Sequence, residues 1–172
     1  MSGAGSGDLW TFSLRVYGDE EVESACLALQ DRHGLDVNLI LLACWLGRRG
    51  VALDPRRLAD LERAVAPWRD EVIRPLRGVR RALKARLQGP LPGGPATAED
   101  AGAIRAKVKA MELAAERVEQ RILEAVSGAW PPATEPGAPA IRANLALLHD
   151  FQGQDRAALE VLVAAAMDRG TP

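Results

Sequence analysis

The chain has 172 residues, of which 48% are apolar and 26% are charged, so it can bury a hydrophobic core of its own. Its apolar residues are mostly alanine (30) and leucine (23), whereas valine, isoleucine and threonine together number 21 and aromatic residues make up 4%. This dominance of helix-forming residues excludes an all-β fold and argues against a parallel sheet, and two cysteines are too few for a disulfide scaffold. The net charge of -1 provides no overall field that would draw the protein to nucleic acid or anionic lipid.

The first half of the chain predicts three helices after a flexible N-terminus, residues 1–7, which lacks the basic start and apolar stretch of a signal peptide. A short aromatic-rich helix is expected over residues 8–17, and a second helix over residues 19–32 that ends at Gly34. The third helix follows Asp36 as its N-cap and is apolar on every side. A helix without a polar face is buried by its neighbours, so this segment is predicted to be the central helix.

The next predicted element is a long helix that starts at the pair Asp54-Pro55 and bends near Pro67 and Pro75. A Gly/Pro-rich loop over residues 89–96 follows it. A second long helix is then expected to start at Thr97 as its N-cap, with apolar residues at alternating steps of four and three that are typical of bundle packing. These residues are Ile104, Val108, Met111, Ala115, Val118, Ile122 and Ala125.

A second Gly/Pro-rich loop at residues 131–139 precedes two shorter helices, over about 140–150 and 155–169. Taken together, the elements predict an all-α fold: a single-domain helical bundle over residues 8–169, with roughly five to seven helices around the buried central one.

One cluster of polar residues lies between the two most apolar of the N-terminal helices: Gln30, Asp31, His33, Asp36 and Asn38. These side chains could line a ligand or metal pocket in which His33 titrates or coordinates. The simpler interpretation, which we favour, is that they cap helix ends and form a solvated turn, since Asp36 is already explained as an N-cap.

A second cluster consists of Glu112, Glu116 and Glu119, which share one face of the long helix and repel one another. If this helix packs antiparallel to the preceding one, a basic strip on that helix faces the glutamates, and Arg74 lies level with Glu112. We therefore favour a ladder of ion pairs between the two helices. The strip comprises Arg74, Arg77, Arg81 and Lys84, with Arg80 and Arg86 nearby. A carboxylate metal site is the weaker alternative because the Glu-x-x-His pairs of di-iron bundles are absent.

The first two thirds of the chain contain a long series of residues that form one recognisable pattern: Leu9-Trp10, Phe12-Ser13-Leu14, Tyr17, Ala25-Cys26-Leu27, Leu29-Gln30-Asp31, Gly34, Asp36-Val37-Asn38-Leu39, Trp45, Gly50 and the stretch 112–120. This pattern resembles an uncharacterised proteobacterial family of small helical proteins that is classified as a domain of unknown function. The resemblance extends over roughly residues 8–125 and implies no activity, cofactor or partner. It does mark Gln30, Asp31, Asp36, Asn38 and the three glutamates as positions that match the family pattern.

These observations predict a soluble, cytoplasmic protein, because the longest uncharged apolar run, residues 37–47, is too short to cross a bilayer. No nucleophile, phosphate-loop or dinucleotide motif occurs, so we expect no catalytic residue, metal or cofactor.

The favoured function is a non-enzymatic helical binding or adaptor protein, with a groove lined by the N-terminal aromatic residues and another protein, not nucleic acid, as the partner. The alternative is a small-molecule or metal-binding protein that uses residues 30–38 and the glutamate face 112–119. The oligomeric state stays open.

Overall fold

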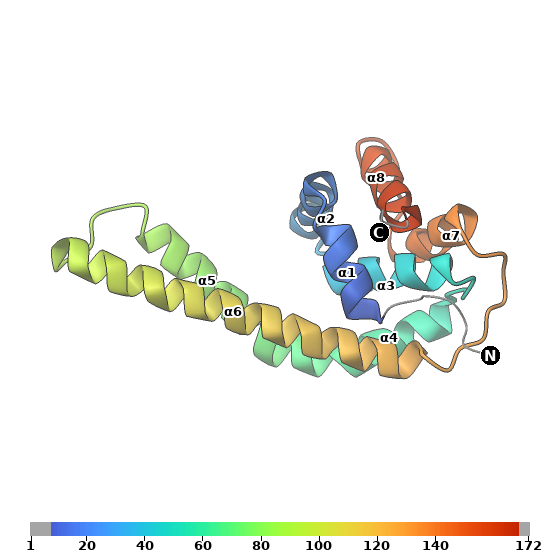
Figure 1. Cartoon of the computed structure of the whole chain (residues 1–172), viewed down its shortest axis with the longest axis horizontal. Coiled ribbons are helices and arrows are strands. Elements are labelled where there is room, and N and C mark those ends of the chain that lie inside the picture. The colour runs from blue at the N-terminus through green and yellow to red at the C-terminus, as the bar shows by residue number, and fades with distance from the viewer. Residues whose placement is uncertain (1–7, 169–172) are drawn as a thin grey trace.

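The computed structural model describes residues 8–168, and this part of the chain is helical without any strand (Figure 1). When α4, η1 and α5 are counted as one bent helix, residues 8–168 contain seven helices, which confirms the predicted all-α fold and helix number. The elements are α1 (Leu9–Tyr17), α2 (Glu20–His33), α3 (Val37–Arg48), α4 (Pro55–Trp68), the π-helical turn η1 (Arg69–Ile73), α5 (Arg74–Arg86), α6 (Gly94–Ser127), α7 (Ala138–Leu148) and α8 (Asp155–Met167).

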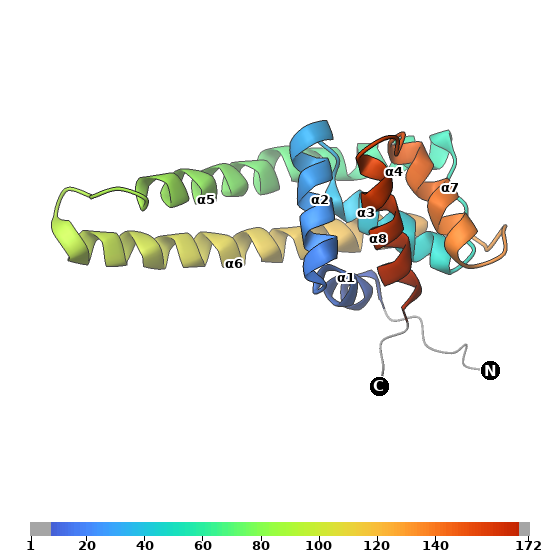
Figure 2. The same ribbon diagram turned by 90° about the horizontal axis from the view of Figure 1, so that it is seen from above.

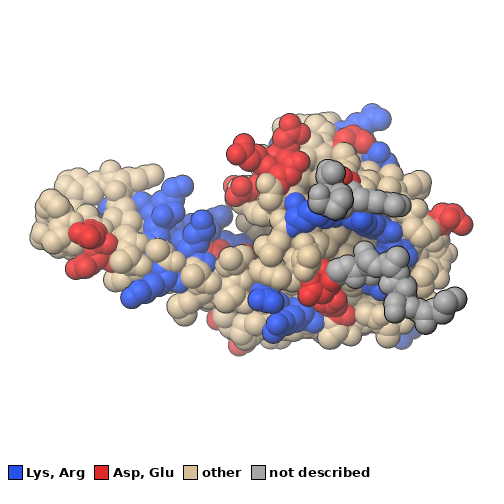
Figure 3. Space-filling model, viewed as in Figure 1, with Lys and Arg blue, Asp and Glu red and all other residues tan. Residues whose placement is uncertain are grey.

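The molecule has a body and an arm. The C-terminal half of α6 packs against α1, α3 and α4 along one edge of the body, and α2, α7 and α8 complete the body against α1 and α3. Helix α5 and the N-terminal half of α6 extend away from the body as an antiparallel pair (Figures 1 and 2). Figure 3 shows that lysine and arginine gather on the arm over α5, while acidic residues gather on the body over α2. None of the described helices combines the length and apolar character that crossing a membrane requires.

The central helix is α3, as predicted, and every residue from Asn38 to Gly47 is buried. Its N-terminus is capped by Asp36, whose Oδ1 accepts a hydrogen bond of 2.8 Å from the backbone N–H of Asn38. Gly34 ends α2 in the left-handed conformation (φ 68°), which glycine adopts without steric cost. These two local signals set the sharp turn that brings polar side chains to the start of an otherwise apolar helix.

The C-terminal helices belong to the same hydrophobic core. Ile141 and Leu145 of α7 and Leu162 and Ala166 of α8 are fully buried against residues of α1, α2 and α3. Asn144 is also buried: its Oδ1 accepts from the Leu53 N–H at 2.8 Å, and its Nδ2 donates to the backbone carbonyl oxygens of Val51 and Ala43 at 3.0 and 3.2 Å. The amide therefore satisfies backbone groups of the loop after α3 that would otherwise be buried without partners.

The bend predicted near Pro67 and Pro75 appears as the π-helical turn η1. Pro75 has no N–H to donate to the carbonyl four residues before it. Just before it, the N–H of Arg74 donates to the carbonyl of Arg69, five residues back, so the wider turn absorbs the interruption without ending the helix.

Two helix starts differ from the sequence prediction. The loop expected at 89–96 is shorter, because α6 begins at Gly94 with Gly93, and not Thr97, as its N-cap. The loop expected at 131–139 likewise ends early, at the start of α7. In both helices a proline lies in the first turn, where its missing N–H is not needed, so the same residue type that suggested a loop starts the helix.

The apolar face predicted for α6 is only partly buried. Ile104, Met111 and Val118 are 52%, 58% and 36% exposed, whereas Glu112 and Glu119 face the interior. The physical reason is that α6 has α5 as its only neighbour along the arm, so one side stays in solvent, and further along it meets polar side chains at the start of α3. The predicted apolar positions therefore have the correct period, but only some of them, such as Ala115 and Ile122, face the core.

Candidate functional site

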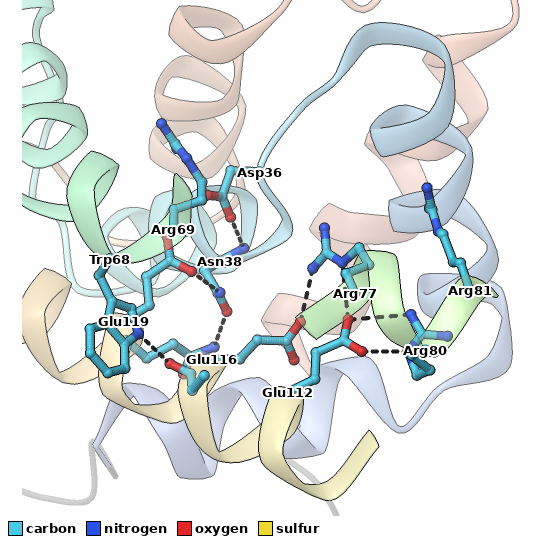
Figure 4. A network of polar contacts seen from close by, with 12 residues as sticks. Asp36, Asn38, Trp68, Arg69, Arg77, Arg80, Arg81, Glu112, Glu116 and Glu119 are labelled. Carbon is cyan, nitrogen blue, oxygen red and sulfur yellow. Dashed lines mark hydrogen bonds and ion pairs between the residues drawn. The ribbon is translucent and has the colours of Figure 1, made fainter. Parts of the chain in front are cut away.

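Polar side chains from α3, α6 and the bent helix α4–α5 meet where the arm joins the body (Figure 4). At the centre is Asn38, whose Nδ2 donates to Glu119 Oε2 at 2.6 Å and whose Oδ1 accepts from Gln120 Nε2 at 2.9 Å. All three side chains are buried, with exposures of 7%, 1% and 2%. Their hydrogen bonds join the central helix to the long helix in a water-excluded region, where such bonds are strong and specific.

A second set of contacts extends from Asp36 to the bent helix. Asp36 Oδ2 accepts from the Arg69 guanidinium at 3.0 Å, and Arg69 also binds Glu62 at 2.9 Å. The indole of Trp68, the last residue of α4, donates to the backbone carbonyl of Ala115 in α6 at 2.9 Å. Asp36, the N-cap of α3, is thereby bound to the same bent helix that contacts α6.

Glu119 holds its proton more tightly than an ordinary glutamate. Burial, together with the charge of Asp36 and a hydrogen bond to it, raises the pKa of Glu119 to about 8. Its Oε1 is buried and accepts no hydrogen bond from a donor within residues 8–168, which suits a protonated carboxyl group that donates to Asp36. At neutral pH Glu119 is therefore protonated and can donate a hydrogen bond to Asp36.

The other two glutamates bind the arm. Arg77 donates from Nε to Glu112 and from an Nη to Glu116, both at 3.0 Å, and Arg80 also donates to Glu112. Burial acts to raise the pKa of Glu112, but the hydrogen bonds from Arg80 and Arg77 outweigh it and hold this pKa below its usual value. Burial raises the pKa of Glu116, and Arg77 offsets only part of that effect.

The cations of the predicted basic strip have different partners. Arg77 reaches the glutamates, and Arg80, noted only as a neighbour of the strip, joins it. Arg74, expected level with Glu112, instead pairs with Asp70 at 2.9 Å, Arg81 pairs with Asp31 at 3.4 Å, and Lys84 forms no ion pair within residues 8–168. The antiparallel register is thus about one helical turn away from the expected one.

The polar cluster of residues 30–38 is divided between four places. Asp36 and Asn38 join the glutamates, and Gln30 lines the cleft described below. Asp31 is exposed and lies beside the arm. His33 is directed elsewhere, toward Asp155 at the start of α8. The proposed pocket of His33 with the glutamates is therefore not assembled.

A cleft of about 350 Å³ opens beside this network, between α1, α2, α3 and the arm; we call it the α1–α2–α6 cleft. One wall is apolar, and its outer leucines, Leu14, Leu27 and Leu113, are 53%, 40% and 49% exposed. The buried floor includes Ser13 Oγ and Gln120 Oε1, which have no hydrogen-bond partner in the described part of the chain. The remaining lining residues include Trp10, Tyr17, Leu41, Asn38, Arg77, Arg80, Lys109, Glu112 and Glu116.

Several residues of this site were missed at the sequence level. Gln120 lies four residues after Glu116 and so shares its face of the helix, which was a usable signal. Arg69 and Ser13 gave none, because each is one polar residue in an amphipathic helix and only the tertiary packing turns it inward.

Comparison with protein families gives one match. The model of a family described as "Protein of unknown function (DUF2390)" matches residues 8–123, which is more than half of the chain and confirms the family resemblance expected from the sequence. The matched range contains Asp36, Asn38 and all residues of the polar network, and it ends within α6, before α7 and α8. Neither a search of curated proteins nor a search of solved structures returned a match.

Proposed function

The chain belongs to this family of unknown function, DUF2390, and from the site alone we propose that it is a non-catalytic binding protein that holds an amphipathic helix of a partner protein in the α1–α2–α6 cleft. The observation that carries the proposal is the combination of an exposed apolar wall with a buried floor whose polar atoms lack partners. Large apolar side chains at the surface of a cleft are typical of interaction sites.

The rim of the cleft favours a helix as the occupant. Leu14, Leu27 and Leu113 come from three different helices, and each lines the cleft while about half of its side chain stays exposed to solvent. A compound that only filled the cavity would leave these leucines in water, whereas an amphipathic helix lying across the opening would cover them. A polar side chain of that helix could donate a hydrogen bond to Gln120 Oε1, which otherwise stays unpaired.

The charged residues of the cleft support a binding role because they bind one another. Arg77 bridges Glu112 and Glu116, and Arg80 holds the second oxygen of Glu112. A side chain that transfers protons in catalysis needs a free oxygen or nitrogen within reach of a substrate. We therefore assign these ion pairs to fixing the arm and shaping the cleft.

A cytoplasmic location is part of the proposal. Cys26 and Cys44 are buried free thiols, and burial raises the pKa of Cys26 to about 12 and also raises that of Cys44. Unreactive, unpaired thiols in the core suit a reducing compartment.

Site-specific photocrosslinking in the producing cell tests the proposal. A photoreactive phenylalanine derivative at position 27 should give one discrete adduct, and mass spectrometry should identify a peptide with apolar residues at steps of three and four. The same derivative at the position of Met167, an equally exposed apolar residue on α8, is the matched control. A second substitution in the cleft, Leu113→Glu, should abolish the adduct. Equal adducts from both positions, or none from position 27, would contradict the proposal.

A small molecule in the same cleft is the second candidate, because Ser13 and Gln120 offer unpaired buried polar atoms. Its ligand set would retain Gln30, Asp36, Asn38, Glu112 and Glu116 from the residues singled out in the sequence. Native mass spectrometry of the purified protein distinguishes the two candidates, since a bound compound adds a small fixed mass that Leu113→Glu should remove.

A further inference from the structure

The only two histidines of the chain meet at one buried carboxylate, although they are far apart in the sequence. His33 Nε2 lies 2.8 Å and His149 Nε2 lies 3.0 Å from Oδ2 of Asp155. The two imidazole rings are 4.1 Å apart between centroids, with 30° between their planes. The three potential ligand atoms all lie within 4.8 Å of one another.

The surrounding backbone favours a cation at this point. His33 is the last residue of α2, and His149 directly follows the last residue of α7, so the carbonyl ends of two helices converge here. The C-terminal end of a helix carries partial negative charge, which stabilises a positive ion. Asp155, the first residue of α8, supplies a full negative charge from a side chain that is 7% exposed.

Helix capping alone does not account for this arrangement. The charge of Asp155 is already balanced by Arg32, whose guanidinium lies 2.7 Å from the other carboxylate oxygen, Oδ1. A carboxylate whose charge is balanced by one arginine does not need two imidazoles at its other oxygen, Oδ2.

We propose that His33, His149 and Asp155 form a zinc site, with Nε2 of each imidazole and Oδ2 of the carboxylate as ligands. Zinc bonds of about 2.0–2.1 Å in tetrahedral geometry place ligand atoms about 3.3 Å apart, close to the separations of both nitrogens from Oδ2. Arg32 would keep Oδ1 occupied, so the carboxylate binds through one oxygen and is oriented by its neighbour.

The exposure of the two imidazoles leaves room for a fourth ligand. The side chains of His33 and His149 are 30% and 19% exposed, so a water molecule can complete the tetrahedron and the ion can reach the site from solvent. The ion would also cross-link the ends of α2 and α7 to the start of α8. It would thereby fasten the helices outside the matched family range to the N-terminal half, independently of what the α1–α2–α6 cleft binds.

Metal titration of the full-length, tag-free protein after treatment with a chelator tests the proposal. Calorimetry with Zn²⁺ should give one equivalent bound, and Co²⁺ should give the intense visible absorption of a tetrahedral complex. The substitutions His33→Gln and His149→Gln should each weaken Zn²⁺ binding by more than about tenfold. Asp150→Asn, which removes an exposed acid next to the cluster, is the matched control and should leave binding unchanged.

A ligand-preserving variant separates loss of the site from loss of the fold. His33→Cys replaces one zinc ligand with another and should retain one equivalent of Zn²⁺, with the Co²⁺ spectrum gaining a thiolate charge-transfer band. The absence of stoichiometric binding in the wild-type protein would overturn the proposal. So would binding that is equally strong in His33→Gln and His149→Gln, because the metal would then lie elsewhere.

Discussion

The side chain of Asn38, at the start of the central helix α3, donates a hydrogen bond of 2.6 Å to Glu119 on the long helix α6. Both residues are buried, and the other end of the Asn38 amide accepts from Gln120. Apolar contacts between two helices tolerate sliding, whereas buried hydrogen bonds are lost when the register changes. This amide therefore determines which part of α6 lies against α3, and with it the position of the cleft.

The first prediction concerns the pH dependence of stability and the substitution Glu119→Gln. The folded protein keeps the Glu119 proton up to about pH 8, whereas an unfolded chain releases it near the ordinary value of 4.5. The contribution of this group to the free energy of unfolding is therefore full below pH 4.5 and declines as the pH rises toward about 8. Glutamine cannot release a proton, so the variant should gain stability relative to wild type across this window, with a constant difference above it.

Urea unfolding of both proteins at a series of pH values measures this difference. The charge of Asp36 is one cause of the raised pKa, so the total pH-dependent change should be smaller, over a narrower pH window, when Glu119→Gln is compared in an Asp36→Asn background. A difference between wild type and variant that does not change with pH would show that Glu119 is ionised in the folded protein.

The second prediction concerns the ion pairs that hold the arm. Arg77 binds two glutamates, one of them only 5% exposed, so Arg77→Ala leaves Glu112 with one partner and Glu116 with none. We expect the free energy of unfolding to fall by about 2–3 kcal/mol. The exposed pair Arg81–Asp31 is the control, since Arg81→Ala should cost less than about 1 kcal/mol.

A double variant checks the cause of the loss. If unpaired charge is responsible, adding Glu116→Gln to Arg77→Ala should restore part of the stability in urea unfolding. Equal costs for Arg77→Ala and Arg81→Ala would mean that the arm is held by apolar contacts alone.

The central helix could be predicted because its signals are local. These signals are Gly34 as the terminator of the preceding helix, Asp36 as the N-cap and the apolar run that follows it. Each depends on neighbouring residues only, and the structure places each of them as expected. The bend near Pro67 and Pro75 is local in the same sense, because proline lacks the N–H wherever it occurs.

The site could be predicted only in part because it depends on long-range packing. The repulsion among the glutamates indicated that compensating positive charge must lie nearby. The register of the two antiparallel helices, however, depends on the loop between them and on the π-helical turn. As a result, Arg77 and Arg80 occupy the place expected for Arg74. The contact of His33 with Asp155 spans 122 residues. No periodicity in the sequence reports a contact across such a separation.

The last prediction concerns the close packing of α3 against α7 at Gly47. A Cβ atom at this position would lie 2.5 Å from the backbone N and 2.6 Å from the Cα of Ile141, so Gly47→Ala requires the two helices to move apart. Overpacking of this kind costs about 1–3 kcal/mol, more than alanine gains over glycine in helix propensity. The matched control is Gly78→Ala in α5, where nothing lies within 4 Å and we expect a gain of about 0.5–1 kcal/mol. Urea unfolding should therefore shift the midpoint in opposite directions for the two variants, and a shift in the same direction would show that α7 does not lie directly on α3 at this glycine.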